Sequence, residues 1–110
     1  MMKKKAVLIA FSINSEKFES YYERNKFFRE LYGWKQMIRR EIFVGRTKPK
    51  EKVYVYRRDG LLNGIPHKRV DQSSFIVPED EFDKIENFIK EWEGKVMWKV
   101  FKILLEEDIF

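Results

Sequence analysis

The chain has 110 residues, and its 44% hydrophobic and 16% aromatic content is enough for one folded domain over residues 1–110, whereas a disordered chain would be poorer in aromatic residues. It contains no cysteine, which excludes disulfides, thiolate catalysis and cysteine-bound metals. Charged residues make up 37% of the chain, with a net charge of +5, a bias that is typical of thermophile proteins.

Residues 6–11 are a continuous apolar run, which predicts a strand that is covered on both faces and central in a sheet. Three lysines precede the run, but it is too short to cross a bilayer. We therefore expect a cytoplasmic protein with no membrane partner. Asn14 or Ser15 is expected to cap a helix with apolar residues at helical spacing, and Gly33 to end it.

The middle of the chain shows strand patterns. Residues 34–44 alternate with a period of two, which predicts a strand. A polar loop is expected over residues 46–52, followed by a β-branched and aromatic strand over residues 53–58. An Asp-Gly and an Asn-Gly turn signal come next, so residues 65–77 are expected to return as an irregular strand.

A second helix is predicted to begin at Pro78, with acidic first turns and an end at Gly94. Residues 95–107 fit a strand by their β-branched and aromatic side chains, and fit a helix by the spacing of their charges. We prefer the strand and keep the helix as the alternative. The resulting order, roughly βαββ(β)αβ, predicts an α+β fold: a ferredoxin-like sandwich with a mainly antiparallel sheet and two helices on one face.

The charge is distributed unevenly. Residues 35–70 hold eleven bases and three acids, a net charge of +8, while residues 71–110 have a net charge of −6. Bases that neutralise phosphates release counterions, so the basic block predicts polyanion binding. The alternative is that the block balances the acidic C-terminal third across a solvated, salt-bridged surface.

Lys52, Tyr54, Tyr56 and Arg58 are predicted to share one strand face, with two valines opposite. RNA-recognition sheets stack unpaired bases on aromatic residues placed in this way, although the rings could also pack under a helix. The candidate residues for binding RNA or DNA are Arg39, Arg46, Lys48, Lys50, Lys52, Tyr54, Tyr56, Arg57, Arg58, Lys68 and Arg69.

The sequence contains few residues that match known catalytic or metal-binding motifs. His67 is the only histidine, which rules out a two-histidine metal site, and we interpret it as a surface residue rather than a general base paired with Asp71. The sequence has no phosphate loop and no nucleophile elbow. Accordingly, no catalytic residue, metal or cofactor is predicted.

The first half resembles the Cas2 family of CRISPR-associated proteins, which are small ferredoxin-like dimers. The resemblance lies in the strand over residues 7–13, the helix ending Leu31-Tyr32-Gly33 and the strand ending at Gly45. In that family the first strand ends in a metal-binding Asp, and Ser12 occupies the matching position here. The resemblance therefore implies a dimeric nucleic-acid-binding fold and places metal-dependent cleavage in doubt.

Three hypotheses of function follow. The first is a nucleic-acid-binding module that uses a basic sheet surface and has no enzymatic activity. The second is a Cas2-like, metal-dependent phosphodiesterase in which Asp59 or Asp71 supplies a carboxylate. The third is a structural or protein-interaction domain whose basic and acidic faces pair between subunits.

Overall fold

The computed structural model describes residues 3–42, 45 and 50–110. Helices and antiparallel strands are both present, which confirms the α+β class. The elements, in chain order, are β1 (Lys4–Ile13), a short 3₁₀ turn η1 (Ser15–Lys17), α1 (Tyr21–Tyr32), β2 (Trp34–Ile42), β3 (Lys50–Arg58), η2 (Leu61–Gly64), β4 (Lys68–Asp71), β5 (Ser74–Pro78), η3 (Glu79–Glu81), α2 (Phe82–Glu91) and β6 (Val96–Leu105).

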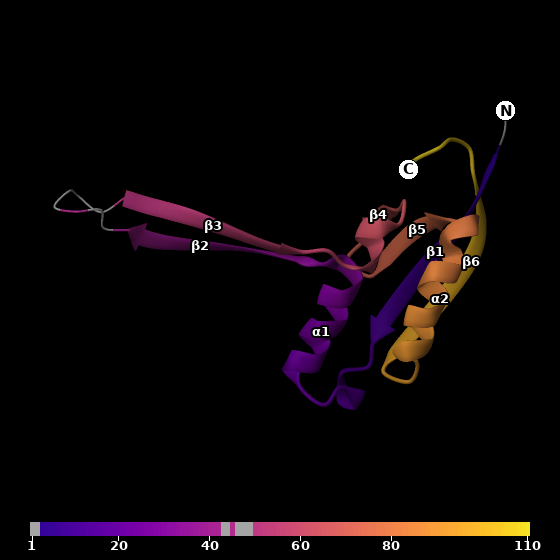
Figure 1. Ribbon diagram of the computed structural model, residues 1–110. Helices are drawn as coiled ribbons and strands as arrows, with labels where there is room; N and C mark the ends of the chain where they lie inside the picture. Colours follow the sequence, from indigo (N-terminus) through magenta and orange to yellow (C-terminus); the bar gives the residue numbers. More distant parts are fainter. Residues whose placement is uncertain (1–2, 43–44, 46–49) are drawn as a thin grey trace.

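Four of the strands form an antiparallel sheet in the order β4-β5-β1-β6. The path from β1 to β4 runs through α1, and the path from β5 to β6 runs through α2 (Figure 1). β1 and β4 are therefore not neighbours in the sheet, because β5 lies between them. In the same way, β1 lies between β5 and β6. β1 therefore pairs along its whole length with β6 and also with β5. We call this sheet and its two helices the body of the protein.

The core lies between the helices and one face of this sheet. Val7, Ile9 and Phe11 of β1 are buried on that face, whereas Leu8 on the other face is partly exposed. β1 is central as predicted, but its second face is covered only in part: Ala6 is buried there, Leu8 and Ala10 are partly exposed, and Ser12 is exposed. The helices, the residue that follows α2, and β5 supply most of the remaining core residues: Phe27, Leu31, Phe75, Val77, Ile85, Phe88 and Trp92.

Both helices begin later than the sequence predicts. Phe18 is extended and stacks on Trp92 with ring centroids 6.0 Å apart, so the residues before it form only the turn η1. α1 starts after Ser20, whose Oγ accepts a hydrogen bond from the Glu23 amide at 3.3 Å. Pro78 ends β5 and precedes η3, and α2 starts only at Phe82.

The structure tests the predictions for residues 65–77 and residues 95–107. Residues 96–105 form β6, so the strand prediction is confirmed and the helical alternative is wrong. The irregular strand expected over residues 65–77 is two strands, β4 and β5, whose pairing contains an irregularity between Arg69 and Asp71. No helix among the described residues is long and apolar enough to span a membrane.

β2 and β3 do not join the four-stranded sheet. They pair with each other, from Trp34 opposite Arg58 to Ile42 opposite Lys50, and project from the body as a long hairpin (Figure 1). The prediction that these strands belong to the same sheet as β1 is therefore wrong. β3 also begins earlier than predicted, at Lys50, and residues 43–44 at the predicted end of the preceding strand lie outside the described residues.

The hairpin leaves and rejoins the body at two glycines in close contact. Gly33 ends α1 with φ of 79° and ψ of −177°, a backbone conformation that side chains rarely tolerate. A Cβ at Gly33 would lie 2.5 Å from the Arg58 carbonyl oxygen, and a Cβ at Gly60 would overlap the Gly33 nitrogen. The two ends of the hairpin therefore meet at one point on the body.

Candidate nucleic-acid interface

The register of the hairpin divides its side chains into two faces, because directly opposed residues of an antiparallel pair lie on the same side. We call the first the aromatic face; it consists of Trp34, Gln36, Ile38, Arg40, Lys50, Lys52, Tyr54, Tyr56 and Arg58. The opposite face consists of Lys35, Met37, Arg39, Glu41, Glu51, Val53, Val55 and Arg57.

The two faces differ in charge. The aromatic face carries four bases and no acid, a net charge of +4, while the opposite face carries three bases and two acids. On the opposite face, Arg39 Nε lies 3.7 Å from Glu51 Oε1. Arg57, also on that face, pairs through its Nε with Asp59 Oδ1 at 3.4 Å. Among the described residues of the hairpin, net positive charge is therefore concentrated on the aromatic face.

The bases and aromatic rings of the aromatic face are interleaved. The Tyr54 ring is half-buried, with Lys52 Nζ 5.3 Å and the Arg40 guanidinium carbon 6.0 Å from its centroid. Tyr56, one pleat nearer the body, is 48% exposed. Cations over aromatic faces at such distances are attracted by the ring quadrupole, so the bases are held beside the rings.

A groove continues the aromatic face onto the body. It has a volume of about 380 Å³ and lies between α1 and the root of the hairpin, and its lining residues are Tyr22, Lys26, Arg29, Glu30, Trp34, Arg58 and Asp59. Trp34 and Arg58 belong to both the groove and the aromatic face. The Arg29 guanidinium carbon lies 5.6 Å from the centroid of the Trp34 ring. We call this hollow the root groove.

The structure separates the candidate residues into four groups. The aromatic face holds Lys50, Lys52, Tyr54, Tyr56 and Arg58, while Arg39 and Arg57 lie on the opposite face. Lys68 and Arg69 belong to β4 in the body. The remaining two, Arg46 and Lys48, lie outside the described residues.

Sequence reasoning missed several residues of this surface, among them Trp34, Arg40, Lys26 and Arg29. Trp34 and Arg40 were open to prediction, because the period of two places them on one face with Ile38. Lys26 and Arg29 of α1 also lie beside the hairpin root. Nothing local in the sequence points to these two, because their position depends on how the hairpin leaves the body.

Acids of the C-terminal third pair with lysines of the same third or with a lysine of β1. Glu79 pairs with Lys102, Glu86 with Lys90, and Asp108 with Lys4. Within the described part of the chain, no ion pair joins a base of residues 35–70 to an acid of residues 71–110. Among the described residues, no contact therefore supports the hypothesis that the acidic third balances the basic block.

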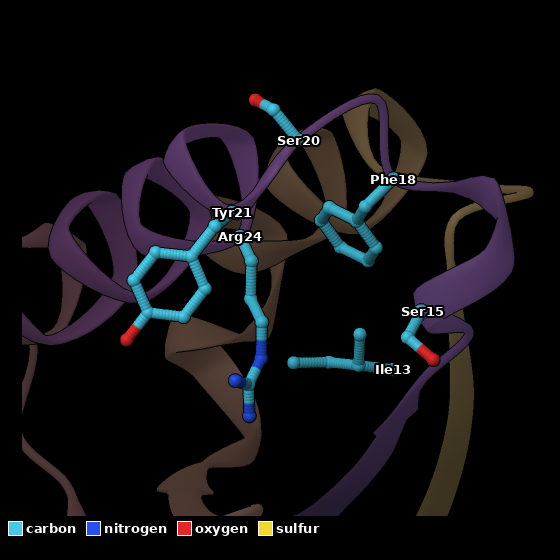
Figure 2. Close-up of a pocket in the computed structure, with 6 residues that line it drawn as sticks. All are labelled: Ile13, Ser15, Phe18, Ser20, Tyr21 and Arg24. Atoms are coloured by element: carbon cyan, nitrogen blue, oxygen red, sulfur yellow. The ribbon is translucent and has the colours of Figure 1, made fainter.

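A second hollow, of about 580 Å³, lies at the start of α1 and is lined by Ile13, Ser15, Phe18, Ser20, Tyr21 and Arg24 (Figure 2). In Figure 2 the Arg24 side chain extends toward Ile13, and the Ser20 hydroxyl points away from the hollow. Of the six described residues that line it, Arg24 alone is charged. The lining therefore offers no acid–base pair.

The candidate catalytic side chains make local contacts. His67 Nδ1 lies 2.8 Å from the Ile65 carbonyl oxygen, and Asp71 Oδ1 accepts a hydrogen bond from the Gln72 amide at 2.7 Å. Ser12 is exposed on β1, opposite Met97. The described residues contain no group of three or more His, Asp or Glu side chains placed to hold a metal ion.

Neither a protein-family model, nor a curated protein, nor a solved structure matches this chain.

Proposed function

We propose that this protein binds nucleic acid through the aromatic face of the β2–β3 hairpin. The observation that carries the proposal is the unequal charge of the two faces: four bases without an acid on the aromatic face, against three bases and two acids on the other. The bases can neutralise phosphates, and the exposed ring of Tyr56 can stack on a nucleobase.

The hairpin form supports this function. A two-stranded ribbon that projects from a folded body is accessible from both sides and along both edges, so it can lie against a phosphate backbone without rearrangement of the core. Four phosphate contacts would make the affinity fall roughly a hundredfold between 50 and 200 mM salt. Such a salt dependence is the signature of a phosphate-binding surface.

Two charge-matched double variants test the proposal. Arg40→Gln with Lys52→Gln removes two charges from the aromatic face, and Lys35→Gln with Arg57→Gln removes two from the opposite face. The first should lower affinity for RNA or DNA and reduce the slope of log affinity against log salt by about 1.4–1.8. The second should leave that slope nearly unchanged. Fluorescence anisotropy at several salt concentrations measures both.

Two results would contradict the proposal. One is wild-type protein with no salt-dependent affinity for either single-stranded or duplex nucleic acid. The other is an equal loss in the two double variants, because this would show a response to net charge alone rather than to one face.

We also propose that the body is a ferredoxin-like sandwich and that the hairpin is an insertion between α1 and β4. Two features support this: the interleaved paths β1–α1–β4 and β5–α2–β6, and the packing of both helices on one face. The strand order along the chain differs from the predicted one because the inserted strands lie outside the sheet. The homodimer implied by the Cas2 resemblance stays a prediction.

A further inference from the structure

We infer that the root groove receives an unpaired nucleobase, so that the protein prefers single-stranded nucleic acid to duplex. This inference rests on the proposed function, because the groove continues the aromatic face. The occupant is identified by the chemistry of the lining: an aromatic platform, cations for a phosphate, and carboxylates that can accept hydrogen bonds from a base.

Trp34 is the aromatic platform. Its side chain is half-buried, and the Arg29 guanidinium lies over its ring at 5.6 Å. A planar base can lie against an indole ring or a guanidinium plane, because every base has a π-face. This surface is therefore suited to a base without being specific for its identity.

The cations of the groove can bind the phosphate of a nucleotide, and its acids can bind the polar edge of the base. Lys26 and Arg58 can meet the phosphate. Glu30 and Asp59 can accept hydrogen bonds from the amino groups of a base, because ionised carboxylates only accept. Both acids already have a basic neighbour: Glu30 Oε1 lies 3.9 Å from Lys26 Nζ, and Asp59 Oδ1 lies 3.4 Å from Arg57 Nε.

The shape of the groove favours a single strand. Its volume of about 380 Å³ falls in the range of sites that hold small molecules, about 300–1,000 Å³. In a duplex the flat faces of the bases are covered by their stacked neighbours, so a base must be unpaired and unstacked before it can lie against Trp34. Duplex can contact the charges of the aromatic face but cannot fill the root groove.

Substitution of Trp34 tests the inference directly. Full-length wild-type protein and the Trp34→Leu variant are titrated with a single strand of about twelve nucleotides and with a duplex of the same length. Wild type should bind the single strand more tightly. Trp34→Leu should lower single-strand affinity about tenfold, the effect expected from one lost stacking contact, and lower duplex affinity much less. Trp34→Phe, which keeps an aromatic ring, should retain most of the preference.

Tyr21→Leu is the matched control, because Tyr21 is a 73% exposed aromatic residue of α1 that does not line the root groove. It should not change either affinity. Binding of the single strand should also quench tryptophan emission in wild type and not in Trp34→Phe, because Trp92 is buried in the core and Trp98 packs against it. Circular dichroism confirms that each variant folds.

The outcomes separate the two proposals. If Trp34→Leu lowers single-strand and duplex affinity equally, or if wild type binds duplex as tightly as single strand, the inference about the root groove is overturned and nucleic-acid binding stands. If wild type binds neither, the proposed function itself fails.

Discussion

Glu23 and Lys95 join the start of α1 to the segment between α2 and β6. Lys95 Nζ donates a hydrogen bond to Glu23 Oε1 at 2.5 Å, and the side chains are 34% and 17% exposed, respectively. This hydrogen bond lowers the pKa of Glu23 below its usual 4.5, and the same contact raises the pKa of Lys95 above its usual 10.5. Both residues are therefore charged over a wide range of pH.

The Glu23–Lys95 pair predicts a pH-dependent contribution to stability. Because the folded pKa of Glu23 lies below its unfolded value, its contribution is fully present above the unfolded value, about 4.3–4.5, and is lost as pH falls through the folded one. Glu23→Gln should therefore lower the unfolding temperature at neutral pH, and the difference from wild type should shrink below pH 4.5. Thermal unfolding across pH measures this.

The control for this prediction is Glu16→Gln, which removes an exposed carboxylate from η1. Its unfolding temperature should stay close to that of wild type at every pH. A difference between Glu23→Gln and wild type that is constant from neutral to acidic pH would show that the charge of Glu23 is not the cause.

Arg69 shows how the environment of a residue decides its role. The sequence places it among the candidate nucleic-acid ligands, but its guanidinium carbon lies 3.9 Å from the centroid of the Tyr32 ring. Tyr32 in turn donates a hydrogen bond from its hydroxyl to the Gln72 carbonyl oxygen at 2.7 Å, and burial raises its pKa. Through Tyr32, α1 therefore contacts both Arg69 of β4 and the turn that follows β4, and no local sequence pattern reveals these contacts.

At the scale of elements, the junction between α1 and the hairpin has no space for a side chain at Gly33 or Gly60. Gly33→Ala should destabilise the protein by at least about 2 kcal/mol, because a Cβ there is strained by the positive φ and overlaps backbone atoms. Gly64→Ala is the control, since a Cβ at Gly64 would meet nothing within 4 Å, and its effect should stay within about 0.5 kcal/mol. Urea unfolding of the two variants measures the difference, and equal stabilities would contradict this account.

The sequence predicted the types of the main elements better than their partners. Period-two alternation identified β2 and β3, because side chains of any strand alternate. It did not reveal that they pair only with each other, since a period carries no information about the neighbouring strand. One feature did point that way: residues 35–41 carry charges on both faces, so neither face suits a buried sheet.

At the scale of the molecule, the hairpin dominates the shape. The radius of gyration is 19.3 Å, against about 13 Å for a compact domain of this length, and the longest dimension is 65 Å. Much of the basic block found by counting charges therefore lies away from the body. The count located the hairpin charges but could not divide them between two faces or place α1 beside them, because both depend on the register and on packing between distant segments.

The contact between Gly33 and Gly60 has a consequence for how the protein is assembled. None of the hairpin residues whose burial the structure describes belongs to the buried core, and the chain re-enters the body where it left it. A variant that lacks residues 34–59 and joins Gly33 to Gly60 should therefore fold, with cooperative thermal unfolding, a smaller radius in X-ray scattering and no affinity for nucleic acid. An unfolded product would show that the body needs the hairpin. The hairpin is in this sense an appendage, which such a body can acquire, exchange or lose without repacking its interior.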